Sequence, residues 1–181
     1  MNWQTIKAKA GQYQKAIFGT IGALVSGIWL AAILAHQPAV NPPPIPLWHS
    51  GINEWTLTND YQTSETVSGV TYTVTIKEGF KTDGASIPGT LAWPLGLNRD
   101  SPSIIRGAVI HDALYASELV ERQVADSILY AVCLQDGTDP DKARAIWQAV
   151  HEWGFIVWDS HTPDSIKQAR AMVSVTVART P

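Results

Sequence analysis

The sequence contains little cysteine and no concentration of positive charge. Its one cysteine, Cys133, can form neither an intrachain disulfide nor a zinc site built from cysteines. Its 13 lysines and arginines stand against 16 aspartates and glutamates, for a formal net charge of −3. No long basic cluster provides the footprint of a nucleic-acid-binding protein. We therefore expect neither a disulfide framework nor a nucleic-acid partner.

The longest apolar stretch without a charge runs over residues 17–35. It is long enough to cross about 30 Å of hydrocarbon as a helix. Three lysines precede it, so the positive-inside rule places residues 1–16 in the cytoplasm. We expect a transmembrane helix over 17–35. A cleaved signal peptide is the competing interpretation, although its apolar region is normally shorter.

A proline-rich segment occupies residues 36–46 and separates this stretch from the rest of the chain. Such a segment forms a stiff polyproline linker. Residues 47–181 are then expected to form one globular domain. This order places the domain on the periplasmic side of a bacterial inner membrane. Association with a virion is the other localisation that we consider.

Small residues recur every fourth position within the apolar stretch. A stripe of this kind is a common self-association face of membrane helices, although glycine and alanine are also simply frequent there. The residues are Gly19, Ala23, Gly27 and Ala31.

The domain shows both strand and helix patterns. Alternation predicts strands over 54–58 and 71–76, and β-branched residues over 173–177 favour a return to the sheet. Helical periodicity follows over 103–119, 121–134 and 140–158, and a short fourth helix starts near 162. We therefore predict an α+β fold: a small antiparallel sheet, an antiparallel helical hairpin and a third long helix.

Three polar side chains interrupt the first, otherwise apolar helix. His111 and Tyr115 share a face because they are four residues apart, and Asp112 lies beside them. A tight hairpin brings Asp126 of the next helix within about one turn of His111. Asp126 could then hold the imidazole as a general base that acts on water. A simple Arg122–Asp126 ion pair within the second helix is the structural alternative.

An oxygen-rich cation site is a second possibility at the same helix. Asp112 points sideways, and the loop over 80–89 contributes Asp83 and carbonyl groups around Gly84. Carboxylate and carbonyl oxygens are the ligands that calcium prefers. An Asx-type turn at Asp83 is the alternative. Likewise, Tyr115 can be a core aromatic residue whose hydroxyl group bonds a carboxylate.

Three spaced motifs carry a resemblance to a known family. They are FKTDGASIP at residues 80–88, HDALY at 111–115, and Arg122 followed by Ala125-Asp126. Together they resemble a family of short phage and prophage proteins that is catalogued as a domain of unknown function. The resemblance extends over about residues 70–158. It implies a viral or prophage origin and no particular activity.

The motif His111-Asp112-x-x-Tyr115 also resembles the active-site helix of the phospholipases A2. This resemblance implies that His111 is the base that activates water and that Asp112 binds calcium together with loop carbonyls. It further implies that Asp126 orients the histidine and that Tyr115 bonds Asp126.

Two hypotheses of different classes follow. The first is a membrane-anchored, phage-type protein in which His111 and Asp126 hydrolyse an ester, with membrane phospholipid as the substrate. The second is a non-enzymatic viral structural or membrane-associated component that contacts other viral proteins. In the second, the same polar residues form a buried network that stabilises the helical hairpin.

Overall fold

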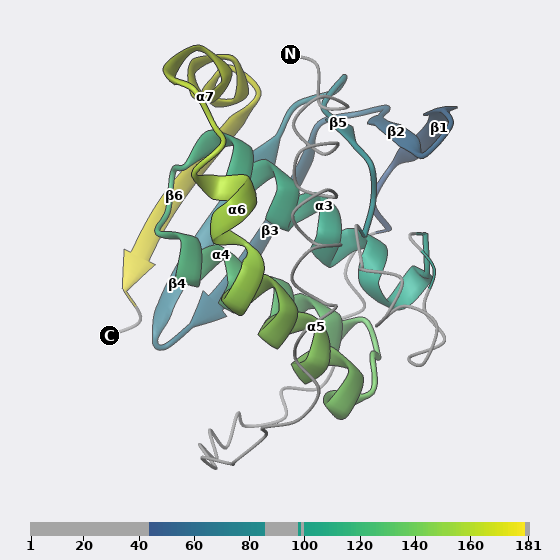
Figure 1. Ribbon diagram of the computed structural model, residues 1–181, viewed down its shortest axis with the longest axis vertical. Coiled ribbons are helices and arrows are strands. Elements are labelled where there is room, and N and C mark those ends of the chain that lie inside the picture. The colour runs from purple at the N-terminus through teal and green to yellow at the C-terminus, as the bar shows by residue number, and fades with distance from the viewer. Residues whose placement is uncertain (1–43, 86–97, 99, 180–181) are drawn as a thin grey trace. The chain divides into compact units, whose positions relative to one another are not determined.

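The structure is a computed structural model, in which residues 44–85, 98 and 100–179 are described. Strands come first, helices follow, and one strand returns at the end (Figure 1). The strands are β1 (Leu47–Gly51), β2 (Glu54–Leu57), β3 (Tyr61–Val67), β4 (Val70–Ile76), β5 (Lys81–Thr82) and β6 (Val173–Arg179). The helices are α3 (Pro102–Ser117), α4 (Arg122–Gln135), α5 (Pro140–Trp153), α6 (Phe155–Trp158) and α7 (Pro163–Arg170).

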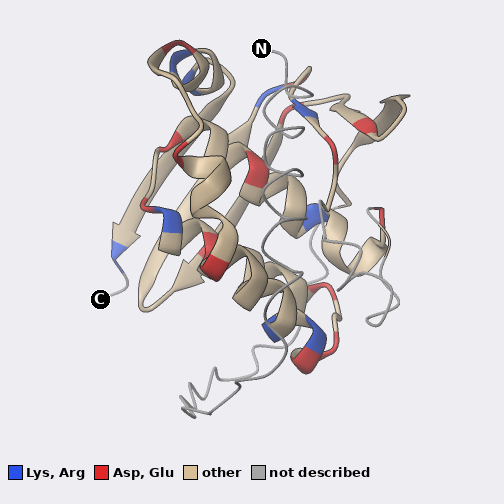
Figure 2. Cartoon of the chain, viewed as in Figure 1, with Lys and Arg blue, Asp and Glu red and all other residues tan. Residues whose placement is uncertain are grey.

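The strands form two antiparallel sheets, one with the order β1–β2–β5 and one with the order β3–β4–β6. In Figure 1 the second sheet lies on the left of α3 and the first on the upper right. The cartoon in Figure 2 shows acidic and basic residues interspersed over both regions. The β5 strand is short, but it pairs Lys81 and Thr82 of the loop motif with β2.

The β3–β4–β6 sheet has one buried face and one hydroxyl-rich face. Successive strand residues point to opposite faces, and the buried set includes Tyr61, Val74, Ile76 and Val173. Ser68 and Gly69 both have positive φ and join β3 to β4 in a two-residue turn, which suits a right-twisted hairpin. Strand β6 then pairs with β4 over its whole length.

Helix α3 is the central helix of the domain. Most of its residues from Ile104 to Ser117 are buried, because α4, α7 and the β3–β4–β6 sheet all pack against it. A helix that is apolar on all sides is expected to lie inside a core in this way. Gly107 allows the close approach of α4, since a Cβ there would lie 3.1 Å from Leu129 Cδ1.

Local capping signals define the later helices. The Asp139 side chain accepts hydrogen bonds from the backbone of Asp141 and Lys142, and Pro140 occupies the first turn. Thr162 and Ser165 form a reciprocal capping box at the start of α7. These starts agree with those predicted from the sequence.

The predicted architecture is corrected in two respects, although the α+β class holds. There are two small sheets instead of one, because β1, β3 and β5, which were not predicted, add the pairing partners that separate them. The third helix ends at Trp153, and α6 follows after Gly154, so residues 140–158 are not one continuous helix.

The predicted transmembrane helix also needs correction as part of this architecture. None of the helices in residues 44–85, 98 and 100–179 combines the length and the apolar character that a membrane crossing requires. The stretch over 17–35, its small-residue stripe and most of the proline-rich linker lie outside the described residues.

Candidate functional site

Asp126 is the centre of the candidate site. It lies on α4, is fully buried, and its Oδ1 atom is 3.0 Å from His111 Nε2 and 2.6 Å from the Tyr115 hydroxyl oxygen. The hairpin therefore brings together the three residues that the sequence predicted would meet. A buried carboxylate requires such donors, since leaving it without them costs several kcal/mol. The contacts are present, and the catalytic roles of these residues stay predictions.

The His111 ring is held on two sides. Its Nε2 faces Asp126, and its ring centroid lies 4.0 Å from that of Tyr115. The residue retains 8% of its surface exposed. With Nε2 bonded to a carboxylate, the favoured neutral tautomer carries its proton on Nε2, which leaves Nδ1 as the basic nitrogen.

Tyr115 donates its hydroxyl proton to Asp126 and is itself packed by an aromatic neighbour. Its ring meets Trp158 edge to face at 5.2 Å. Burial, and then the hydrogen bond to Asp126, raise the pKa of Tyr115 above its usual range, so the hydroxyl group remains a donor. Tyr115 is therefore both a core aromatic residue and a member of the cluster.

Arg122 supplies the positive charge opposite Asp126. Its Nη1 atom lies 3.2 Å from Asp126 Oδ2, four residues away on the same helix. The same atom also approaches the carbonyl oxygens of Val150 at 3.2 Å and His151 at 3.0 Å. The ion pair weighed as the structural alternative is thus present, and it additionally ties α4 to the end of α5.

His151 is a member of the cluster that the sequence reasoning missed. Its Nδ1 atom lies 3.7 Å from Asp126 Oδ2, is buried, and makes no hydrogen bond. The ring stacks on Trp147 with centroids 4.7 Å apart. The only sequence signal was the four-residue spacing of Trp147 and His151 on one helix face, and this spacing does not reveal the distance to α4.

Gly154 shapes the boundary of the cluster. A Cβ at this position would collide with the Tyr115 hydroxyl group and with the Val150 carbonyl group. The absence of a side chain therefore allows the junction of α5 and α6 to close against Tyr115. We call His111, Tyr115, Arg122, Asp126 and His151 the Asp126 cluster.

The two predicted calcium ligands lie where strand β5 meets helix α3. The Thr82 hydroxyl group donates to Asp112 Oδ2 at 2.6 Å and accepts from the backbone N–H of Gly84 at 3.0 Å. Asp83 follows Thr82 directly, so strand β5 and helix α3 bring the first two motifs together. The described residues contain no group of three or more histidine, cysteine, aspartate or glutamate side chains arranged to hold a metal ion. That Asp112 and Asp83 bind calcium stays a prediction.

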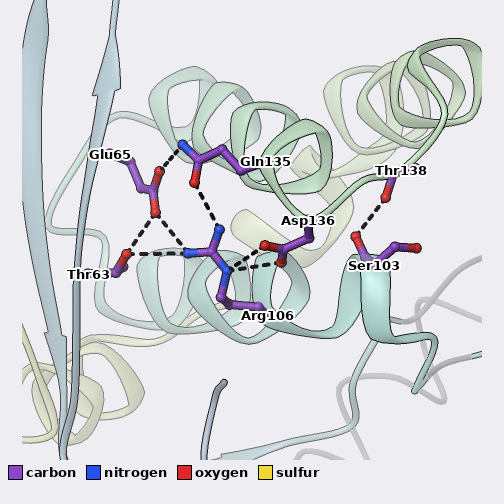
Figure 3. Close-up of polar contacts among 7 residues, drawn as sticks. All are labelled: Thr63, Glu65, Ser103, Arg106, Gln135, Asp136 and Thr138. Atoms are coloured by element: carbon purple, nitrogen blue, oxygen red, sulfur yellow. Dashed lines mark hydrogen bonds and ion pairs between the residues drawn. The ribbon is translucent and has the colours of Figure 1, made fainter. Parts of the chain in front are cut away.

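A second buried polar cluster lies further along the α3–α4 hairpin and was not predicted (Figure 3). We call it the Arg106 network. Arg106 Nε contacts both carboxylate oxygens of Asp136 at 3.0 and 2.9 Å, and Nη1 lies 3.1 Å from Glu65 Oε1. Gln135 accepts from Arg106 Nη2 at 2.9 Å and donates to Glu65 Oε2 at 2.8 Å. Thr63 donates to Glu65 Oε1 at 2.8 Å.

The carboxylates of the Arg106 network keep Arg106 charged, although its side chain is nearly completely buried. Burial by itself lowers the pKa of Arg106, but the hydrogen bond and charge of Asp136, with further contributions from Tyr61 and Glu65, raise it overall. The charged side chains are 4% exposed for Arg106, 1% for Glu65 and 10% for Asp136. The network therefore connects α3, the end of α4 and β3 through charges that are nearly completely buried, with the exposed Gln135 at its rim.

Comparison with known proteins gives one result. No curated protein and no solved structure matches the chain. Residues 55–150, more than half of the 181, match the family described as "Protein of unknown function (DUF1353)". This range contains the loop before α3, the His111–Tyr115 turn and Asp126, which are the residues that carried the resemblance. The chain therefore belongs to the DUF1353 family of proteins of unknown function.

Proposed function

We propose that the protein is a hydrolase in which His111, oriented by Asp126, activates water for attack on an ester. The observation that carries this proposal is the fully buried Asp126 carboxylate, which is shared between His111 Nε2 at 3.0 Å and the Tyr115 hydroxyl group at 2.6 Å. A base of this kind needs one nitrogen fixed and the other available, and it typically contributes a rate factor of about 10² to 10⁴.

The proposed steps use only the residues of the chain. His111 Nδ1 takes a proton from water as the water oxygen forms a bond to the ester carbonyl carbon. The imidazolium that results is stabilised by Asp126 through Nε2. The ester C–O bond then breaks, and the proton held on Nδ1 passes to the departing alkoxide oxygen. Tyr115 and Arg122 keep the carboxylate fixed throughout, so the base does not lose its orientation.

Phospholipid acyl esters are the first substrates to test, since the phospholipases A2 carry the resembling His-Asp-x-x-Tyr turn. The assay is release of fatty acid from phospholipid vesicles by the full-length chain. We expect His111→Gln to lower kcat/KM about 100-fold or more. The matched control is His49→Gln, which changes an exposed histidine of β1 whose ring lies tilted 5.0 Å from that of Trp55.

Folding of both variants is checked by circular dichroism. A folded His111→Gln variant with unchanged hydrolysis contradicts the proposal, and so does the absence of fatty-acid release by the wild-type chain. The same assay with added calcium and with a chelator separately tests the prediction that Asp112 and Asp83 bind this ion.

A non-enzymatic role is the second candidate, and the contacts of Arg122 favour it. Its Nη1 joins the Asp126 carboxylate to two carbonyl groups at the end of α5, as a purely structural ion pair would. In this role the protein is a structural component of a viral particle, and the cluster only holds three helices together. It predicts that Tyr115→Phe and His111→Gln change the melting temperature and that no ester is hydrolysed.

A further inference from the structure

The two edges of the β3–β4–β6 sheet are constructed differently. At one edge, β3 carries the buried, inward-pointing Glu65 and is packed by α4. Inward-pointing charges and covering helices are devices by which proteins prevent a sheet edge from pairing with another chain. At the other edge, α3 and α7 contact β6, but the strand has no buried charge. Its residues from Val173 to Ala178 include no charge, proline or glycine, and Figure 2 shows one basic segment at its carboxyl end.

Strand β6 is also regular along its length. Its pairing with β4 runs without a register shift from Val173 opposite Ile76 to Arg179 opposite Val70. Within the described part of the chain, no strand pairs with its other side. Val177 is 54% exposed, although it is a large apolar residue on the same face as the buried Val173. An edge with these properties is a template for an additional strand.

The alternation of hydrogen-bonded and non-hydrogen-bonded pairs between β4 and β6 identifies which backbone groups of β6 point away from the sheet. The backbone N–H of Lys77 donates to the Met172 carbonyl group at 2.8 Å. In an antiparallel ladder, bonded and non-bonded pairs alternate. Ser174, Thr176 and Ala178 therefore direct their N–H and C=O groups toward β4. The backbone groups of the residues between them point away from the sheet, and these residues are Val173, Val175, Val177 and Arg179.

We propose that β6 pairs with β6 of a second copy of this chain, in an antiparallel arrangement with Thr176 opposite Thr176. This arrangement makes the interface isologous, as a two-fold dimer requires. It overlaps the full seven-residue strand, so all four outward-facing residues gain backbone partners. The two three-stranded sheets become one sheet across the two-fold axis.

The sequence of β6 suits this partner because it is complementary to itself. Val175 lies opposite Val177 of the copy, so valines face valines on one side of the sheet and the exposed Val177 is covered. Arg179 lies opposite Val173 and not opposite another arginine, so no like charges meet across the axis. On the other side, Ser174 and Thr176 continue the exposed hydroxyl-rich face.

Cross-linking tests the proposed register. Thr176→Cys in the full-length chain places two thiols at a directly opposed, non-hydrogen-bonded pair, where the Cα separation of about 4.5 Å suits a disulfide. We expect a covalent dimer on mild oxidation that a reductant separates. The matched control is Ser64→Cys, at an exposed position of the same face on the protected β3 edge. The native Cys133 is buried and does not interfere.

A proline variant tests the pairing itself. The Val177 N–H points away from β4, so Val177→Pro removes an edge donor but keeps the ladder to β4. By sedimentation velocity over the micromolar range, we expect a wild-type dimer and a dimer dissociation constant raised about tenfold or more in the folded variant. A wild-type monomer at all concentrations overturns the proposal. A dimer unchanged by Val177→Pro, or equal cross-linking of Ser64→Cys and Thr176→Cys, also overturns it.

Discussion

The Arg106 network and the Asp126 cluster join the same two helices, but their polar groups differ in how fully they are hydrogen-bonded. In the Arg106 network, both partner carboxylates and the Gln135 amide are hydrogen-bonded, and no member is a histidine. In the Asp126 cluster, two imidazoles approach one carboxylate, and His151 Nδ1 makes no hydrogen bond. The difference indicates that, in a buried network whose role is only to stabilise the fold, every polar group has a hydrogen-bond partner. The Arg106 network was not predicted, and the stabilising role predicted for the residues around His111 stays a prediction.

Breaking the Arg106 network is expected to lower the free energy of unfolding the most. Arg106→Leu leaves Glu65 and Asp136 without their cation, and removal of one partner from a buried ion pair costs about 3–5 kcal/mol. Arg144→Leu is the matched control, because Arg144 is exposed on α5 and makes no ion pair with the residues that the structure describes. Urea unfolding of both variants measures the difference. Equal losses of unfolding free energy in the two variants would contradict the stabilising role of the network.

A smaller loss is expected at the edge of the Asp126 cluster. Gly154→Ala forces a methyl group against the Tyr115 hydroxyl group and the Val150 carbonyl group, and overpacking of this kind costs about 1–3 kcal/mol. Gly51→Ala is the control, since a Cβ there meets its nearest neighbour at 3.6 Å. Gly154→Ala should lower the melting temperature less in a Tyr115→Phe background than in the wild-type background, because Tyr115→Phe removes one of the two colliding atoms. An equal lowering in the two backgrounds would mean that the Val150 carbonyl group alone makes Gly154 necessary.

The thiol of Cys133 reports whether the Arg106 end of the hairpin is closed to solvent. Burial, followed by the charge of Asp136, raises the pKa of Cys133 from 9.0 to about 12. Between these values the unfolded chain loses the thiol proton and the folded chain keeps it. The free energy of unfolding therefore falls as the pH rises, by about 1.4 kcal/mol per pH unit in this window.

Urea unfolding at about pH 8 and at about pH 10, with Cys133→Ala as the reference, measures this contribution. The alanine variant should lack that part of the slope. If the two chains lose stability in parallel, the thiol titrates in the folded protein and the Arg106 end is open to solvent.

The smallest effect is expected at His151. His151→Phe preserves a ring that can stack on Trp147 and removes a buried nitrogen that makes no hydrogen bond. The free energy of unfolding should change by no more than about 0.5 kcal/mol. Thermal unfolding followed by circular dichroism measures it. A loss as large as that of Arg106→Leu would instead make His151 a bonded member of the cluster and remove the contrast between the two networks.

The sequence predicted contacts between residues that are close along the chain better than contacts between residues that are far apart along it. Asp126 is 15 residues from His111, and a tight turn between two helices leaves few ways for them to lie. Arg106 meets Asp136, at the end of α4, at a separation of 30 residues, and it meets Glu65 at 41 residues, on the strand β3 that was not recognised. Helical period identifies a face, but it does not specify which distant strand covers that face.

The amino-acid sequence by itself determined where α3, α4, α5 and α7 begin to within about a residue, with caps at Asp139 and Thr162, and it determined the meeting of His111 with Asp126. These features depend on backbone geometry within a few turns of helix, which local residue choices control. Only the tertiary structure decided that there are two sheets, that Arg106 lies between Glu65 and Asp136, and that His151 and Gly154 border the Asp126 cluster. Those contacts depend on how separate elements pack, because burial of apolar surface is not directional and many local patterns are compatible with it.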